Sequence, residues 1–169
     1  MLKYTRGDIL KSTEPIIVHQ VNCLCVKPFG LSNDIFTKYP YADVYSTRRK
    51  MGNKNLSVPE DRGTPGEIIV REDNTGPTIV GLFGQLDYGK PGKSCYHTTL
   101  LQDNLKLREE WFQTCLTKLK EYLTTNKHKR VAFPNLIGCG LGGGDWNVYK
   151  KMLQDFAKNS PFEVIIYIL

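Results

Sequence analysis

A chain of 169 residues is long enough to bury one full hydrophobic core, so we expect a single domain. No apolar run approaches the roughly 20 residues that cross a bilayer, and no signal peptide opens the sequence. These features argue against a membrane protein and predict an intracellular one, cytoplasmic or nuclear. The 23 lysines and arginines exceed the 17 aspartates and glutamates, and this positive excess favours anionic ligands.

The five cysteines show neither a C-x-x-C pair nor the cysteine–histidine spacing of a zinc site. An odd count fits free thiols in a reducing compartment. We therefore expect no metal ion, and nothing in the sequence points to a cofactor.

The first part of the chain predicts two strands and a short helix. Apolar runs at 2–5 and 16–21 are bounded by turn residues and indicate strands. A helix is predicted over 31–38, with Ser32 as its cap and Tyr39-Pro40 as its end.

The segment 41–65 is rich in Arg, Asn, Gly and Pro, which predicts a long irregular excursion. Loops of this length are often functional. Within it, Tyr45, Arg48 and Arg49 either line a ligand cleft or belong to the surface, and the sequence leaves both readings open.

The rest of the chain alternates between strands and helices. A helix is predicted over 102–125, where apolar residues recur at spacings of three, four and seven, and another over 145–159, with Asp145 at its N-cap position. The last strand is nearly all apolar, as expected for a strand covered on both faces. The strands predicted here are 67–71, 78–83, 129–133 and 163–169.

Strands alternating with helices predict an α/β layer sandwich. In open α/β sheets, ligands bind beyond the carboxyl ends of the strands. Two segments follow such ends, namely 22–30 after the second strand and the glycine-rich run 138–144 after the strand at 129–133.

Five of the seven residues from 138 to 144 are glycine, and the run stands between a strand and a helix. Such a turn directs several N–H groups at one point, which suits a phosphate. A Walker A motif is absent, and a dinucleotide-binding turn is disfavoured because Glu163 begins the next strand rather than ending it. The remaining readings are a diphosphate-binding loop or a flexible surface loop.

Four motifs in the same order resemble the macrodomain family, which binds ADP-ribose. Gly7-Asp8-Ile9 matches the G-D-I signature, and IVHQVN at 17–22 aligns with the I-V-N-A-A-N end of the second strand. The run VAFP at 131–134, followed by Gly138-Cys139-Gly140-Leu141, matches the family's strand and substrate loop, and 163–169 matches the closing strand. The resemblance implies one macrodomain over 1–169, a three-layer α/β/α sandwich around a central mixed sheet.

By position, the resemblance implies that Asp8 accepts a hydrogen bond from the adenine amino group and that Ile9 lies beside the base. Asn22 is then expected near the distal ribose, and Phe83 is either a wall of the cleft or a core residue. Residues expected to wrap the diphosphate and distal ribose are Gly138, Cys139, Gly140, Leu141, Gly142, Gly143 and Gly144.

The loop after the second strand departs from the glycine-rich family pattern. Pro28 and Phe29 restrict it, and Gly30 is its remaining glycine. Gly30 and Leu31 are the ligand-binding candidates there, and Lys27 is expected to supply charge in place of the missing glycines.

The catalytic residues also depart from known branches of the family. His19, in place of the first asparagine of I-V-N-A-A-N, resembles the ADP-ribose 1''-phosphate phosphatases, whereas the glycine loop resembles the terminal ADP-ribose glycohydrolase. That enzyme uses a lysine and an aspartate, but Gly142 stands at the aspartate position and Gly84-Gln85 brings no lysine after Leu82-Phe83.

The remaining catalytic candidates are His19 as acid or base, Asn22 for positioning and Asp145 for orienting water. Each has a structural alternative: a core histidine, a turn asparagine and a helix cap. We expect hydrolysis of a bond at the distal ribose of an ADP-ribose derivative, either ADP-ribosylated protein or nucleic acid or ADP-ribose 1''-phosphate.

A non-catalytic reader of free or protein-linked ADP-ribose is the alternative. The expected partners are ADP-ribose or an ADP-ribosylated macromolecule, including modified nucleic acid, and the expected state is a monomer. Binding of nucleic acid through the scattered basic clusters is a third hypothesis, which predicts steep salt dependence.

Overall fold

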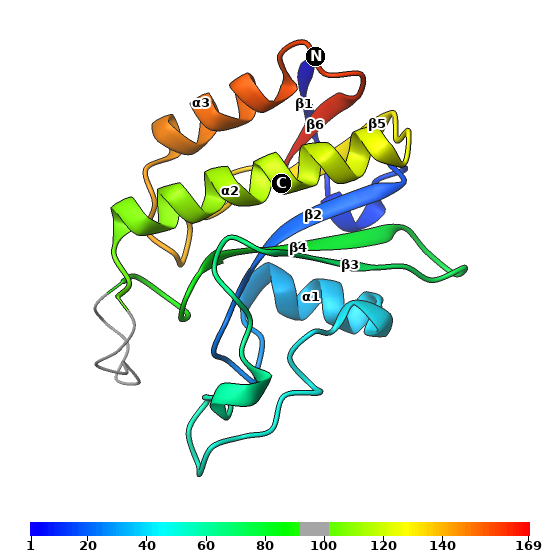
Figure 1. Ribbon diagram of the computed structural model, residues 1–169. Coiled ribbons are helices and arrows are strands. Elements are labelled where there is room, and N and C mark those ends of the chain that lie inside the picture. Colours follow the sequence, from blue (N-terminus) through cyan, green and yellow to red (C-terminus); the bar gives the residue numbers. More distant parts are fainter. Residues whose placement is uncertain (92–101) are drawn as a thin grey trace.

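The computed structural model describes residues 1–91 and 102–169 (Figure 1). In this part of the chain six strands form one sheet in the order β1-β6-β5-β2-β4-β3. All neighbouring strands run parallel except β3 and β4, so the sheet is mixed, as predicted. The strands are β1 (Leu2–Arg6), β2 (Ile16–Asn22), β3 (Ile68–Arg71), β4 (Thr78–Gln85), β5 (Arg130–Pro134) and β6 (Glu163–Ile168).

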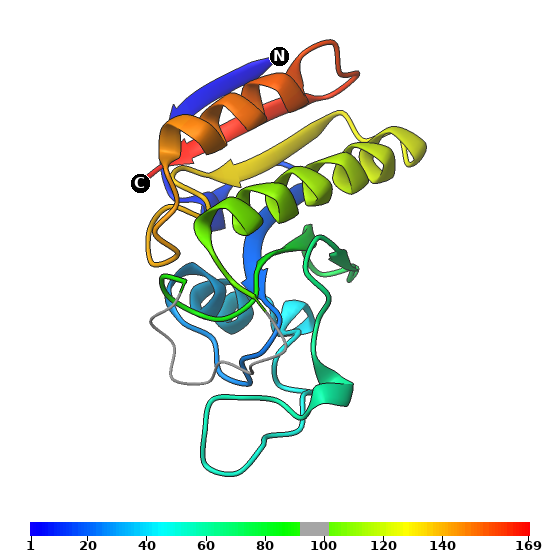
Figure 2. The same cartoon turned by 60° about the vertical axis from the view of Figure 1, so that its left-hand side comes forward.

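Helices cover both faces of the sheet, which confirms the predicted α/β/α layers. Figures 1 and 2 show α2 (Leu105–Thr125) and α3 (Trp146–Ala157) on one face, and α1 (Gly30–Lys38) with the excursion 41–65 on the other. Three short 3-10 turns complete the described structure: Ile9–Lys11, Pro40–Ala42 and Pro59–Asp61. None of the described helices has the length and apolar character needed to cross a membrane.

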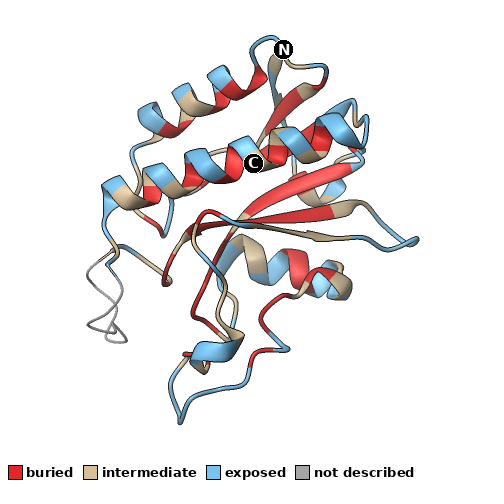
Figure 3. Cartoon of the chain, viewed as in Figure 1, coloured by how far each residue is buried: buried red, intermediate tan, exposed pale blue. Residues whose placement is uncertain are grey.

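The central strands owe their composition to burial on both faces (Figure 3). In β2, Ile16 and Val18 pack into the cluster under α2 and α3, whereas Ile17 and Val21 pack into the cluster on the α1 side. Successive side chains of a strand point to opposite faces, so a strand covered twice must be apolar at nearly every position. The same alternation directs His19 and Gln20 to opposite sides of the sheet.

Side-chain caps set the N-termini of α2 and α3, and the cap predicted for α1 is wrong. Asn104 and Asp145 accept hydrogen bonds from the first turns of α2 and α3, at 2.8 and 2.9 Å, so these helices begin at Leu105 and Trp146. Ser32 does not cap α1. The helix begins earlier, at Gly30, and its N-cap residue makes no side-chain cap hydrogen bond.

The cysteines agree with the expectation of free thiols. Those of the described residues, Cys23, Cys25, Cys115 and Cys139, are not in disulfides. The fifth, Cys95, lies outside the described residues.

Because β2, β4 and β5 are parallel, their carboxyl ends meet at one edge of the sheet. In the sheet, β4 lies on one side of β2 and β5 lies on the other. The chain passes from β4 through α2 to β5, so it changes sides at β2. This reversal opens the edge beside β2 to a ligand.

Candidate functional site

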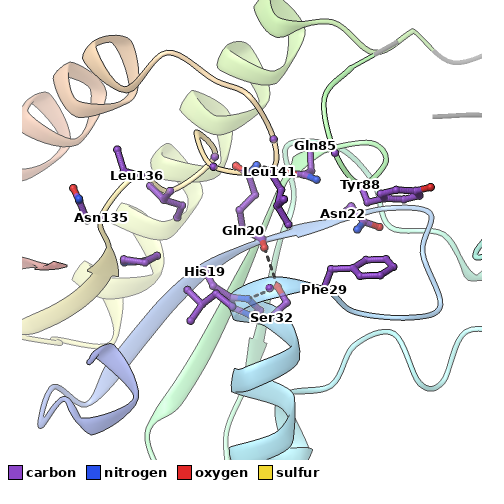
Figure 4. Close-up of a pocket in the computed structure, with 18 of the residues that line it drawn as sticks. His19, Gln20, Asn22, Phe29, Ser32, Gln85, Tyr88, Asn135, Leu136 and Leu141 are labelled. Atoms are coloured by element: carbon purple, nitrogen blue, oxygen red, sulfur yellow. Dashed lines mark hydrogen bonds between the residues drawn. The ribbon is translucent and has the colours of Figure 1, made fainter. Parts of the chain in front are cut away.

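A cavity of about 270 Å³ opens where the carboxyl ends of β2, β4 and β5 meet (Figure 4). Five segments line it: the end of β2, the start of α1, the excursion 41–65, the end of β4 with the loop after it, and the end of β5 with the loop after it. The lining residues are His19, Gln20, Asn22, Phe29, Gly30, Leu31, Ser32, Tyr45, Gln85, Tyr88, Gly89, Pro134, Asn135, Leu136, Ile137, Gly138, Gly140, Leu141 and Gly142.

The glycine loop, residues 138–144, folds back on itself. Gly144 N donates to Gly138 O at 3.1 Å. Gly138 has a φ of 75°, and a β-carbon there would lie 2.6 Å from the Tyr149 ring. A β-carbon on Gly142 would lie 2.8 Å from Gly138 O, whereas one on Gly140 would meet nothing within 4 Å. Most of these glycines therefore shape the loop, and Gly140 leaves its main chain open to the cavity.

The first turn of α1 forms the opposite wall. Gly30 has a φ of 56°, and Gly30, Leu31 and Ser32 all line the cavity. The first N–H groups of a helix have no intrahelical partner and carry the positive end of its dipole. Since Phe29 supplies no side-chain cap, this wall is suited to an anion.

The loop after β2, residues 23–27, uses its own amides internally. Asn22 Oδ1 accepts two of them at 3.2 and 2.8 Å, and Asn55 Oδ1 accepts two more at 2.9 and 2.8 Å. The fifth amide donates to Leu86 O at 2.9 Å. No N–H of residues 23–27 is left for a phosphate, and Lys27 is exposed and does not line the cavity.

The excursion 41–65 braces this loop. Tyr45 Oη accepts a hydrogen bond from Asn22 N at 2.7 Å, and it lines the cavity. Arg48 is buried behind Tyr45, with its guanidinium 4.6 Å from the ring centre, and donates to the carbonyls of Asn22 and Cys25 at 3.0 and 2.7 Å. Arg49 is exposed and pairs with Asp61. The three candidates thus have three different roles.

His19 faces α1, where its Nδ1 lies 3.0 Å from Ser32 Oγ (Figure 4). Ser32 Oγ donates to Gln20 O at 3.3 Å, so its single proton is used and His19 Nδ1–H is the consistent donor. Burial lowers the pKa of His19 to about 3. The imidazole is therefore neutral at pH 7, where it lacks the second ring proton that an imidazolium donates as an acid, and it is a weak base.

Gln20 points from the other face of β2 toward the glycine loop (Figure 4). Its Nε2 donates to Gln85 Oε1 at 2.6 Å, and Gln85 Nε2 donates to Asp87 O at 2.9 Å. β-Carbons on Gly84 and Gly138 would lie 2.4 and 3.1 Å from Gln20 Oε1. Gln20 was not among the residues predicted to bind a ligand, although strand alternation next to His19 places it on the glycine-loop side.

Several other predicted residues lie outside the cavity lining. Asp8 caps the 3-10 turn by accepting Leu10 N at 2.9 Å, Ile9 and Phe83 are buried in the core, and Asp145 caps α3. Lys27, Cys139, Gly143 and Gly144 also fall outside. The predicted residues that meet in the lining are His19, Asn22, Gly30, Leu31, Gly138, Gly140, Leu141 and Gly142.

The charge at this site comes from neighbours rather than from the lining. None of the described lining residues is Asp, Glu, Lys or Arg. The side chain of Lys90 packs on the glycine loop, since a β-carbon on Gly143 would lie 2.7 Å from Lys90 Cγ. No group of three or more potential metal ligands occurs among residues 1–91 and 102–169.

No family model matches the chain, and no curated protein matches it. Solved structures do. The macrodomain of Thermus aquaticus DarG superimposes with a TM-score of 0.69 at 19% identity, covering 100% of this chain and 99% of that one. The macrodomain of Mycobacterium tuberculosis DarG superimposes with a TM-score of 0.69 at 21% identity, covering 100% of this chain and 98% of that one. Thermosipho africanus DarTG in complex with ADP-ribose superimposes with a TM-score of 0.67 at 17% identity, covering 99% of this chain and 42% of that one. At these identities the likeness shows a common fold.

Proposed function

We propose that the cavity binds ADP-ribose, because the chain has the macrodomain fold. The observation that carries this proposal is the pair of facing walls, one made by the first turn of α1 and the other by the glycine loop, which bring main-chain N–H groups to one cavity. A diphosphate is the anion suited to such a pair, because each phosphate can accept several amides. The complex of T. africanus DarTG with ADP-ribose supports the choice of ligand.

The diphosphate would lie between Gly30–Ser32 and Gly138–Gly142. Gly140 is the point of closest approach, because its main chain has open space beside it. The loop at 23–27 would make no phosphate contact, since its amides are already bonded. Positive charge would come from Lys90 beside the glycine loop and not from Lys27.

The adenine would extend toward Asp8. The cavity lining includes Pro134, the last residue of β5, and Asn135 after it, and β6 and then β1 follow in the sheet. Neighbouring strands are about 4.8 Å apart, so the end of β1 is about 10 Å farther along the edge, within reach of an extended nucleotide. Asp8 uses Oδ1 for Leu10 N, and its carboxylate has a second oxygen that can accept from an exocyclic amine.

A reader function has better support than hydrolysis. The described lining contains no carboxylate, His19 is neutral and buried, and Asp145 is occupied as a helix cap. Hydrolysis at the distal ribose remains the second candidate because of Asn22, which lines the cavity and whose Oδ1 is held by the amides of Leu24 and Cys25. The side-chain amide of Asn22 could hold a ribose hydroxyl or an attacking water.

Calorimetry with ADP-ribose tests the proposal, together with turnover assays on ADP-ribosylated protein, ADP-ribosylated nucleic acid and ADP-ribose 1''-phosphate. Gly140→Val should abolish binding without loss of stability, because its side chain enters open space where the ligand would approach. Gly52→Ala is the matched control, since Gly52 has a φ of 61° outside the cavity. It should lose about 1 kcal/mol of stability and keep full affinity.

The outcomes separate the candidates. Binding without any product leaves the reader, and product formation that Asn22→Ala removes establishes the hydrolase. If millimolar ADP-ribose produces neither heat nor a change in melting temperature, the cavity is not an ADP-ribose site.

A further inference from the structure

Arg108, in the first turn of α2, is a buried cation that uses all of its N–H groups. It is 2% exposed. Its Nε and Nη2 form a bidentate pair with the two carboxylate oxygens of Asp103, at 2.8 and 2.6 Å. The Asp103 side chain is 1% exposed, so the pair is screened from water on both sides. Such a pair must be fully hydrogen-bonded to be tolerated.

The other donors of Arg108 reach two separate loops. Nη1 donates to Gly89 O at 2.6 Å and to Gly142 O at 3.2 Å, and Nη2 donates to Asp87 O at 3.1 Å. Asp87 and Gly89 belong to the loop after β4, whereas Gly142 belongs to the glycine loop. Both Gly89 and Gly142 line the cavity. One guanidinium therefore joins two walls of the site that are remote in sequence.

This bonding pattern requires arginine. The guanidinium is a planar fork of five donors at fixed angles, whereas the lysine ammonium is a point charge with three donors. A lysine could keep the ion pair with Asp103, but it could not also reach the carbonyls of both loops in the same geometry. At least one buried carbonyl would then lose its partner.

We propose that Arg108 is a positioning residue, which sets the separation of the glycine loop from the loop after β4 so that the main chain of 140–142 faces the cavity. The inference rests on the proposed function for its ligand. The geometry does not depend on the ligand, because Arg108 joins the two loops through protein groups alone.

The test is Arg108→Lys, examined by amide hydrogen exchange without ligand and by calorimetry with ADP-ribose and with AMP. Exchange of the amides of Gly143 and Gly144, which are hydrogen-bonded within the glycine loop, should be about tenfold faster, while that of the loop at 23–27 stays unchanged. Affinity for ADP-ribose should fall about tenfold in the folded variant. Affinity for AMP should change by less than about threefold, because AMP lacks the distal ribose and the second phosphate and therefore makes fewer contacts with the glycine loop.

Asp103→Asn is the second variant. It tests the positioning role of Arg108 even if Arg108→Lys fails to fold. It retains one acceptor for Arg108 and should accelerate exchange at Gly143 and Gly144 about threefold. If both variants exchange and bind as the wild type does, or if all regions of the protein loosen equally, Arg108 is not a positioning residue. If the wild type fails to bind ADP-ribose, the proposed function falls and the exchange data alone decide the role of Arg108.

Discussion

The two loops that follow β2 and β5 stand at the same edge of the sheet but hold their shapes by different means. The glycine loop depends on its own main chain, with Gly144 N bonded to Gly138 O and little room for β-carbons. The loop at 23–27 has no glycine, and it depends on side chains of Asn22, Asn55 and Arg48. The first arrangement can leave amides for a ligand, and the second consumes them. This difference assigns ligand contact to the glycine loop and to the start of α1.

Each loop also depends on one buried arginine. Arg48 donates to carbonyls of the β2 loop, and Arg108 donates to a carbonyl of the glycine loop. Both guanidinium groups donate to main-chain oxygens, so neither arginine occupies the N–H groups of its loop.

The largest loss of stability is expected for Gly138→Ala, which tests whether this glycine shapes its loop. The left-handed backbone at Gly138 and the Tyr149 ring 2.6 Å from its β-carbon position should together cost about 3 kcal/mol of unfolding free energy, measured by urea denaturation. Gly140→Ala is the control within the same loop and should change stability by less than about 0.5 kcal/mol. Equal effects at the two positions would contradict the division into shaping and open glycines.

His19 supports the α1 wall through Ser32, and its burial predicts a pH dependence. The folded-state pKa is about 3 and the ordinary value is 6.5, so the unfolded chain binds the proton more tightly. Stability is therefore complete above pH 6.5 and is lost as the pH falls toward 3. At pH 4.5 the loss should be about 2–3 kcal/mol relative to pH 7.

His19→Asn provides the reference, since an amide can still bond Ser32 but does not titrate in this range. The measurement is the unfolding free energy of both proteins at pH 7 and 4.5. The same pH dependence in the two proteins would show that His19 is not the group responsible.

Asn55→Ala tests whether side chains shape the loop at 23–27. Asn55 accepts two amides of this loop and donates to Lys27 O at 3.3 Å, so its loss should cost about 1–2 kcal/mol and accelerate amide exchange at Val26 and Lys27. Asn53→Ala, an exposed neighbour in the same excursion, serves as the control. Unchanged exchange at both amides would mean that the loop holds its shape without the excursion.

The smallest effect is expected for charge. Lys90→Met should weaken ADP-ribose binding about threefold at low ionic strength, and the difference should shrink in high salt. Lys27→Met should leave affinity unchanged, because Lys27 is outside the lining. Calorimetry at two salt concentrations makes the comparison, and a larger effect at Lys27 would restore the original expectation for that residue.

Much of the fold was predictable, because it depends on local patterns. Apolar runs bounded by turn residues indicated every described strand of the sheet, and the stripe from Phe112 to Leu123 indicated α2. The site was predictable only in part. Strand ends and glycines pointed to Gly138, Gly140 and Gly142, but they did not show that Lys27 would face away or that His19 would be too buried to be charged.

By itself the sequence determined which segments are strands and helices, and that glycine-rich chain follows β5, since periodicity and backbone freedom are properties of neighbouring residues. Only the tertiary structure decided which amides remain free. That outcome depends on partners far along the chain, such as Asn55 for residue 26 and Arg108 for Gly142. A hydrogen bond requires a donor and an acceptor within about 3 Å, and no local pattern specifies which remote groups will meet at that distance.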